Sequence, residues 1–260
     1  MKKLKNNISI NSDDIVKLIK KNGIAEIDDF LDQETLYQLQ EYIYSEINSN
    51  PKGYSGSVGK EAVKGSPLEY LDRDFGIMEL LQELHSKSFP KKESNKNSLQ
   101  VLKVQSGGGI SGKKNGYMFH YDAYLLTALL PIIIPNRDDG LNGDFMYLKQ
   151  RRNYHNNLVR NIIEKFIIQN PFTRYLLSRK TIQNFFNLKI CKIKPGKLYV
   201  FYGFQTIHGN GVINSITPRA TAIFHYSDPM NGHFIVSRNE KTNRSKINNL
   251  GRFKKNTKHI

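Results

Sequence analysis

The chain has 260 residues, of which 38% are hydrophobic and 11% aromatic, and its formal net charge is +16. This length and apolar content suffice for one large domain with a packed core, or for two small ones. The single cysteine, Cys191, excludes an internal disulfide framework and favours a reducing compartment. The charge fits nucleic acid, an anionic membrane surface or an acidic substrate as partner, or simply a composition rich in lysine and asparagine throughout.

Neither the N-terminus nor the apolar runs indicate export or membrane insertion. The stretch MKKLKNNISINSDD is basic but does not continue into the apolar segment of a secretory signal. The longest apolar run, residues 125–134, contains Thr127 and Pro131 and is too short for a membrane-spanning helix. We therefore expect a cytoplasmic protein, with peripheral contact at a membrane surface left open.

The first 50 residues predict a helix, a strand and a second helix. In NSDDIVKLIKKNG, Ser12 is expected to cap a helix that has an acidic first turn and ends at two lysines and Gly23. The alternation in IAEIDDFL predicts a strand over residues 24–31. The segment DQETLYQLQEYIYSEI predicts an amphipathic helix whose apolar face is formed by Leu36, Leu39, Tyr42 and Ile43.

The middle and late parts of the chain predict a fold rich in strands. Residues 50–66 are rich in Gly, Ser and Pro and predict an exposed loop, and GIMELLQELHSKSF then predicts a helix. The following short apolar or alternating segments predict strands over residues 100–105, 117–134, 143–148, 198–202, 221–226 and 233–236. Strands at this spacing are typical of a β-sandwich or barrel such as a jelly roll. We therefore predict a mainly β, α+β fold with flanking helices.

A helical insert over residues 156–186 interrupts these strands. Leu158, Ile162, Phe166 and Ile167 form a predicted apolar stripe, and Asn170 with Pro171 marks the start of a second helix. Residues 151–180 hold seven Lys or Arg and one acid, Glu164. Three interpretations stay open: a lid over an anionic or acyl-bearing substrate, a membrane-surface helix, or the solvated outer face of an ordinary packed helix. Because the apolar residues exceed what one stripe needs, we favour a lipid-like or membrane-bound substrate.

The chain ends in a basic tail. Residues 241–260 contain seven Lys or Arg, no acid and little apolar surface to bury, which predicts disorder. The domain organisation that follows is a single domain over residues 1–236 and a disordered tail over residues 237–260.

Three side chains form a candidate metal site. In GYMFHYDAYLL, His120 and Asp122 stand two apart in a predicted strand, so both side chains would point to the same side. His208, in YVFYGFQTIHGNG, follows an apolar strand and supplies a third donor. Two histidines and one carboxylate leave coordination positions open, which is the arrangement of non-haem Fe(II) oxygenases.

A candidate carboxylate site follows eleven residues later. In PRATAIFHY, Arg219, Thr221 and Ile223 share one face of a predicted strand. A guanidinium offers two parallel N–H donors to a carboxylate, and a neighbouring hydroxyl adds a third bond. Arg219 and Thr221 would thus hold the distal carboxylate of 2-oxoglutarate while its 2-oxo acid end chelates iron. On an earlier strand, Lys103 and Gln105 share a face, and either could reach the co-substrate; an exposed edge lysine fits equally well.

These motifs resemble the Fe(II)/2-oxoglutarate-dependent dioxygenases, and specifically the phytanoyl-CoA dioxygenase-like family. The similar features are HYD, the late HGNG, the Arg eleven residues after His208, the apolar strand ending in HY, and GIAEIDDFLDQETL near the N-terminus. The resemblance covers about residues 23–228. It implies a double-stranded β-helix, which is a cupin-like jelly roll, with His120, Asp122 and His208 as iron ligands and Arg219 as the 2-oxoglutarate anchor.

The resemblance also implies roles for the residues around His208. Asn210 stands where many members have a serine that contacts 2-oxoglutarate. Gly209 and Gly211 would let the backbone turn tightly beside the metal. Asp122 favours hydroxylation, because related iron halogenases have a small residue at that place.

The implied activity is hydroxylation of an unidentified small organic substrate, anionic or lipid-like, with Fe(II) as cofactor and 2-oxoglutarate and O2 as co-substrates. Succinate and CO2 are the implied co-products. The stretch FMYLKQRRNYH departs from the family pattern on the substrate side and leaves the substrate open. Two alternatives are a nucleic-acid oxidative demethylase, for which the chain shows no known binding motif, and a non-catalytic metal-binding jelly-roll protein.

Overall fold

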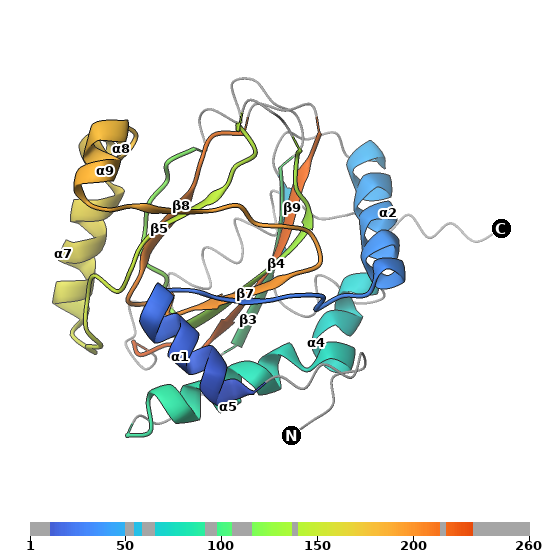
Figure 1. Ribbon diagram of the computed structural model, residues 1–260, viewed down its shortest axis with the longest axis horizontal. Helices are drawn as coiled ribbons and strands as arrows, with labels where there is room; N and C mark the ends of the chain where they lie inside the picture. The colour runs from blue at the N-terminus through green and yellow to red at the C-terminus, as the bar shows by residue number, and fades with distance from the viewer. Residues whose placement is uncertain are drawn as a thin grey trace.

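The computed structural model describes residues 11–49, 55–58, 66–91, 98–105, 116–136, 140–213 and 217–230. Its strands form two antiparallel sheets, a larger one with the order β1-β7-β4-β9-β3-β2 and a smaller one with the order β6-β5-β8 (Figure 1). The strands are β1 (Ala25–Ile27), β2 (Ser55–Val58), β3 (Ser98–Gln105), β4 (Leu126–Ile133), β5 (Phe145–Leu148), β6 (Lys189–Cys191), β7 (Leu198–Phe201), β8 (Ile207–Asn210) and β9 (Arg219–Tyr226).

Helices surround the two sheets. They are α1 (Ser12–Asn22), α2 (Gln33–Ser49), α4 (Tyr70–Phe75), α5 (Ile77–Ser88), α7 (Leu158–Gln169), α8 (Pro171–Leu177) and α9 (Lys180–Phe185), with a 3-10 turn over Pro67–Glu69. More of the described residues lie in helices than in strands, so the fold is mixed α/β with antiparallel sheets, and the prediction of a mainly β fold was wrong in this balance. None of the described helices is long and apolar enough to cross a membrane.

The larger sheet has helices α1, α2 and α5 on one face and the smaller sheet on the other. Along β9, Ala220, Ala222 and Phe224 are buried in one cluster with apolar side chains of α1, α2 and α5. Ile223, which points the other way, packs with Phe145 of the smaller sheet. This is the alternation that a strand dictates, and it directs the odd-numbered residues of β9 into the space between the sheets.

The first two helices form where the sequence predicts them. In α2, Leu39 and Ile43 are each about 1% exposed, and each such burial stabilises the fold by roughly 1.5–3 kcal/mol. In α1, however, the capping residue is Asn11, whose side chain accepts a hydrogen bond from Asp13 N at 3.0 Å. Ser12 lies inside the first turn, buried, and donates to Glu83 of α5. The prediction of Ser12 as the cap was therefore wrong by one residue.

Several strand predictions need correction. The predicted strand over residues 117–134 begins only at Leu126, and the predicted loop over residues 50–66 contains β2, which pairs with β3. The predicted strand over residues 24–31 is limited to β1, after which Asp29 has a φ of 49°. The short strands β6 and β8 were not predicted, because three or four residues give too little alternation to detect. The predicted strand over residues 233–236 and the tail over residues 237–260 lie outside the described residues.

The helical insert packs on the outside of the smaller sheet, on the opposite side of the molecule from α2 (Figure 1). Leu177 of α8 is buried against Met146 and Leu148 of β5. As predicted, Asn170 caps α8, with Pro171 in its first turn. The predicted stripe on α7 does not face the protein, because Ile162, Phe166 and Ile167 are all more than half exposed.

A buried ion-pair cluster holds α7 in place. Arg152, which is 5% exposed, donates from Nη1 to Asn161 Oδ1 at 3.1 Å and to Glu164 Oε2 at 2.7 Å. The Glu164 carboxylate also contacts His155 at 3.1 Å and Arg160 at 2.7 Å. Burial alone would raise the pKa of Glu164, but the hydrogen bonds from Arg152, Arg160 and His155 outweigh it and lower the pKa to about 2.

The Glu164 cluster predicts a pH-dependent contribution to stability. Because the folded pKa lies below the ordinary value of 4.5, the contribution is complete above about pH 4.5 and disappears as the pH falls towards 2. We expect Glu164→Gln to lower the free energy of unfolding by about 3 kcal/mol near pH 7, since it leaves Arg152 buried without its counter-charge. Urea denaturation should show this loss shrinking below about pH 4.

The matched control for this prediction is Glu34→Gln, which removes an exposed carboxylate on α2. Its effect should stay within about 0.5 kcal/mol at every pH. An equal effect of the two substitutions, or a Glu164→Gln effect that does not change with pH, would contradict the assigned role of the cluster.

Candidate metal centre

His120, Asp122 and His208 converge at one end of the space between the sheets. His120 Nε2 lies 3.6 Å from Asp122 Oδ1, and His208 Nε2 lies 3.5 Å from Asp122 Oδ2. One ligand atom from each of the three side chains lies within 4.8 Å of the other two. His120 and Asp122 come from the segment before β4, and His208 comes from β8, so the cluster joins the two sheets. The structure thus brings the predicted triad together.

An isolated β-bridge places the two histidines side by side. His120 N donates to His208 O, and His208 N donates to His120 O, both at 2.9 Å. The centroids of the two imidazole rings are 4.4 Å apart. His120 and Asp122 therefore point to the same side without belonging to a regular strand. The prediction that they converge is confirmed, but the prediction that a strand brings them together was wrong.

Backbone carbonyls set the tautomer of both imidazole rings. His120 Nδ1 lies 2.9 Å from Met118 O, and His208 Nδ1 lies 3.0 Å from Thr206 O. Because a carbonyl oxygen can only accept, each Nδ1 must donate its proton. The neutral ring then has an unprotonated Nε2, and both Nε2 atoms face Asp122. This is the orientation that second-sphere hydrogen bonds give to metal-binding histidines.

Asp122 is buried and held ionised. Its Oδ2 accepts a hydrogen bond from Thr127 Oγ1 at 2.6 Å. Burial would raise the pKa of Asp122, but the neighbouring His208 and His225 rings, and hydrogen bonds from His120 and His208 when these rings carry a second proton on Nε2, hold the pKa well below its usual value. A buried carboxylate that stays charged is a suitable ligand for a divalent cation.

Two residues that were not predicted to act at the site, Thr127 and His225, form a hydrogen-bonded chain that ends at Asp122. His225 Nδ1 lies 3.1 Å from Thr127 Oγ1, and its ring stacks on Tyr124 with the centroids 5.0 Å apart. His225 continues the face of Arg219, Thr221 and Ile223 by one further step of two, so the same alternation could have placed it in the pocket. Thr127 could not be assigned from the sequence, since it is one polar residue in an apolar run.

At Gly203 and Gly209, neighbouring atoms lie so close to the backbone that a side chain would not fit. Gly209 and Gly211 are not among the glycines with positive φ, so the prediction that they form a tight turn was wrong. A Cβ atom at Gly209 would lie 3.1 Å from Met118 O, across the histidine bridge. Gly203 is the tightest position, because a Cβ atom there would overlap Thr127 Oγ1 and Asp122 Oδ2.

Arg219 lies at the other end of the same pocket. Its side chain is buried, and its Nη2 donates to Asn210 Oδ1 at 3.2 Å. Thr221 lies next to it on β9, and its hydroxyl is a buried polar atom without a hydrogen-bond partner among the described residues. A native protein rarely leaves such a group unsatisfied, so the Thr221 hydroxyl fits a ligand with a hydrogen-bonding group at this end of the pocket.

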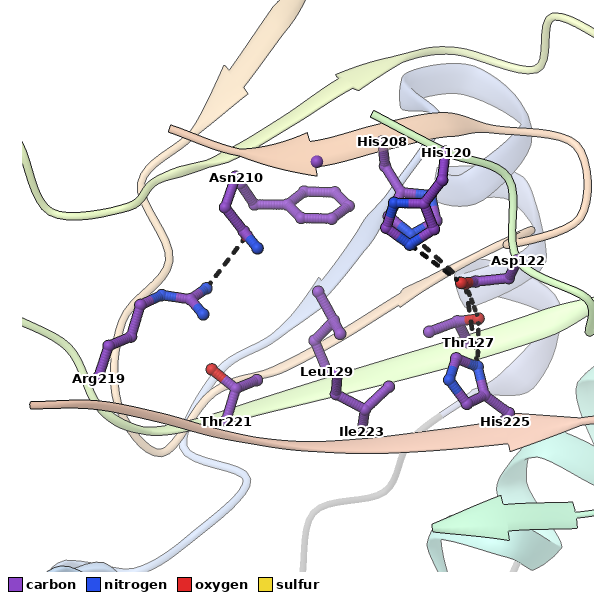
Figure 2. A pocket seen from close by; sticks show the side chains of 12 residues that line it. His120, Asp122, Thr127, Leu129, His208, Asn210, Arg219, Thr221, Ile223 and His225 are labelled. Carbon is purple, nitrogen blue, oxygen red and sulfur yellow. Dashed lines mark hydrogen bonds and ion pairs between the residues drawn. The ribbon is translucent and has the colours of Figure 1, made fainter. Parts of the chain in front are cut away.

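Apolar side chains separate the two polar ends. Figure 2 shows the triad at one end, Arg219 with Asn210 and Thr221 at the other, and Leu129 with Ile223 between them. The pocket is lined by His120, Asp122, Thr127, Leu129, Phe145, His208, Gly209, Asn210, Arg219, Thr221, Ile223 and His225. A ligand that fits this order has a metal-chelating end, an apolar middle and an anionic end.

Strand β3 pairs with β9, which lines this pocket. In the register of β3 and β9, Lys103 pairs with Thr221 and Gln105 pairs with Arg219. The choice between Lys103 and Gln105 as a co-substrate contact stays open, because the side chains of β3 lie outside the described part of the structure.

Comparison with known proteins identifies the fold. No family model matches the sequence, and no curated protein matches it either. A prolyl-4-hydroxylase from Pseudomonas putida is similar in structure, with a TM-score of 0.53 and 11% identity over 84% of this chain and 98% of that chain. The epimerase SnoN from nogalamycin biosynthesis, which is non-haem and α-ketoglutarate dependent, has a TM-score of 0.52 and 11% identity over 84% of this chain and 80% of its own.

A third similar structure is the carbocyclase SnoK of the same biosynthesis, also non-haem and α-ketoglutarate dependent. It has a TM-score of 0.51 and 12% identity over 88% of this chain and 91% of its own. The chain therefore has the fold of α-ketoglutarate-dependent non-haem iron oxygenases, with a His-Asp-His cluster between its sheets. The narrower resemblance to the phytanoyl-CoA dioxygenase-like family stays a prediction.

The overlap at Gly203 yields a test of the metal centre. We expect Gly203→Ala to push Thr127 and Asp122 out of position and to weaken Fe(II) binding at least about tenfold, a typical effect of disturbing the second sphere of a metal. Anaerobic isothermal titration calorimetry measures this change. Gly211→Ala is the matched control, because the nearest atoms to its Cβ lie 3.7 Å away. Equal Fe(II) affinity in both variants would contradict the geometry described.

Proposed function

We propose that this chain is a non-haem Fe(II)- and 2-oxoglutarate-dependent dioxygenase that hydroxylates a small organic substrate. The observation that carries the proposal is the order of groups in the pocket: a His-Asp-His cluster, an apolar middle formed by Leu129 and Ile223, and a buried arginine. 2-Oxoglutarate has the same order, with a chelating 2-oxo acid, two methylene groups and a distal carboxylate. The fold shared with α-ketoglutarate-dependent enzymes supports the match.

The residues of the triad fit iron as their ligand. His120 and His208 would bind through Nε2, since their Nδ1 protons are engaged by backbone carbonyls. Asp122 would bind as a carboxylate held by Thr127. A two-histidine, one-carboxylate set would leave coordination positions open for 2-oxoglutarate and O2. Bound iron supplies the oxidation in which one atom of O2 enters succinate, formed with CO2 from 2-oxoglutarate, and the other enters a C–H bond of the substrate.

The residues of the chain would bind and orient 2-oxoglutarate and would shield the pocket from water. Arg219 would pair with the distal carboxylate, and Thr221 would donate to the same group its hydroxyl, which has no partner among the described residues. Asn210 accepts from Arg219 and so holds the guanidinium in place. Its amide nitrogen, a donor, is the group that would contact 2-oxoglutarate. Phe145 and Phe201 pack around the His208 ring, with centroids 5.7 Å and 4.8 Å away, and limit access of water.

Three finer features belong to this proposal. The two antiparallel sheets would form the double-stranded β-helix of the jelly-roll type. The chain would belong to the phytanoyl-CoA dioxygenase-like family, which the HYD, HGNG and spaced-arginine motifs support. The substrate would be anionic or lipid-like, because the apolar and basic insert is joined to the metal segment. Arg152 binds Asn161 and Glu164 of the insert and lies over the ring of Tyr121, 4.0 Å from its centroid, between His120 and Asp122 in sequence.

Succinate formation tests the enzyme assignment. In air, with Fe(II), ascorbate and 2-oxoglutarate, we expect the wild type to form succinate slowly without its substrate. Arg219→Ala should raise the apparent KM for 2-oxoglutarate roughly tenfold to a hundredfold, because a charge-assisted pair contributes about 1.5–3 kcal/mol. Arg219→Lys should fall between the two, since it keeps the charge but loses the paired donors.

The matched control is Arg179→Ala, which removes an exposed arginine outside the pocket. It should leave the KM for 2-oxoglutarate unchanged. A folded, iron-loaded wild type that forms no succinate above the protein-free background would contradict the proposal and favour a non-catalytic metal-binding protein.

A further inference from the structure

Exposed apolar side chains are concentrated on one segment of the chain. Of the fifteen large hydrophobic residues described as exposed, ten fall between Val159 and Ile190. This segment covers α7, α8, α9 and the start of β6, which lie together on the side of the smaller sheet (Figure 1). Apolar patches that gather in this way mark interaction sites, whereas scattered exposed residues do not.

Helix α7 is attached to the protein by its polar side. Asn161 and Glu164 face inward and bind the buried Arg152. The outward positions are Val159, Ile162, Ile163 and Phe166, which are 66%, 53%, 53% and 76% exposed. A surface helix normally buries its apolar stripe against the core, so this helix has the reverse orientation.

The next two helices also carry strongly exposed apolar side chains. Phe172 of α8 is 69% exposed, and Phe185 of α9 is 80% exposed. Both helices are fixed to the protein from beneath: Arg174 donates to Gly116 O at 2.8 Å, and Arg151 donates to Phe186 O at 2.8 Å. We name Val159, Ile162, Ile163, Phe166, Phe172 and Phe185 the outer face of the insert. It is anchored by directed hydrogen bonds.

The chain segment that carries the outer face is strongly basic. Glu164 is the sole acid between Asp144 and Asp228 in the sequence, and its carboxylate is engaged by Arg152, His155 and Arg160. The same interval contains exposed cations, among them Lys180 and Lys189. A surface of aromatic and aliphatic side chains bordered by unopposed cations is complementary to an anionic phospholipid bilayer, where apolar groups enter the interface and cations meet headgroups.

We propose that the outer face of the insert docks this protein onto an anionic phospholipid membrane. A second copy of the chain fits less well, because a symmetric contact would bring the cationic borders of two copies together. Nucleic acid would pair with the cations but not with Val159, Ile162 and Ile163. This inference does not depend on the proposed function, but it is consistent with it: Arg152 and Arg174 join the insert to the segment that contains His120 and Asp122, so docking would hold the pocket close to the bilayer.

Vesicle binding tests the docking proposal. We expect the full chain to co-sediment with vesicles of phosphatidylcholine and phosphatidylglycerol, and to bind phosphatidylcholine vesicles at least about tenfold more weakly. The double variant Phe166→Ser/Phe172→Ser should lose at least about tenfold in affinity for the anionic vesicles, because its apolar contribution is removed while every charge is kept. The matched control is Tyr37→Ser, which removes a 62% exposed aromatic side chain from α2 on the opposite side of the molecule.

A second pair of variants separates charge from apolar insertion. Lys180→Gln/Lys189→Gln should also weaken anionic binding, and Lys17→Gln/Lys20→Gln on α1 should weaken it much less. Circular dichroism confirms that each variant is folded, and succinate formation is measured separately, so that failure of docking and failure of the enzyme assignment are distinguished.

Three results would overturn the proposal. The first is a folded wild type that does not bind anionic vesicles. The second is full vesicle affinity in Phe166→Ser/Phe172→Ser, which would assign binding to charge elsewhere in the chain. The third is a wild-type dimer in light scattering that becomes a monomer in Phe166→Ser/Phe172→Ser, which would assign the outer face to a second copy.

Discussion

The β-bridge between His120 and His208 is the constraint on which the site depends. Its two hydrogen bonds tie the segment before β4, an element of the larger sheet, to β8 of the smaller sheet. Because the bridge is isolated, it fixes the two residues without forming a regular ladder, and the imidazoles stand side by side over Asp122. The other features of the metal centre depend on this contact. Backbone carbonyls set the tautomers of the two histidines, Thr127 orients Asp122, and the absence of a side chain at Gly203 leaves space for Thr127 and Asp122.

The two sheets give the pocket its two ends. β8 supplies His208 and, two residues on, Asn210; β9 supplies Arg219, Thr221 and His225 along one face. Strand alternation therefore sets the order of the groups that β8 and β9 contribute, whereas His120 and Asp122 come from the segment before β4. On the other face of the larger sheet, the helices bury the remaining residues of β4, β7 and β9, so the pocket rests on a well-packed core.

The sequence predicts which side chains meet in this pocket better than it predicts their local structure. The triad, Arg219 and Thr221 line one pocket, as predicted, because the type and spacing of donor residues can be recognised without knowledge of the fold. The reason first given for the pairing of His120 and Asp122, a continuous strand, was wrong, since a long-range bridge positions them. The orientation of α7 could not be predicted, because periodicity identifies an apolar stripe but not the buried Arg152 that attracts the polar side.

The most direct test of the iron site is an anaerobic visible-absorption titration of the protein with Fe(II) and 2-oxoglutarate, because it reports on the triad and the co-substrate without requiring a substrate. We expect a weak metal-to-ligand charge-transfer band that appears only with both components. The band should vanish in His208→Ala and should need far more 2-oxoglutarate in Arg219→Ala. A folded wild type that shows no band, or a band that survives in His208→Ala, would contradict the assignment of the His-Asp-His cluster as an iron site that binds 2-oxoglutarate.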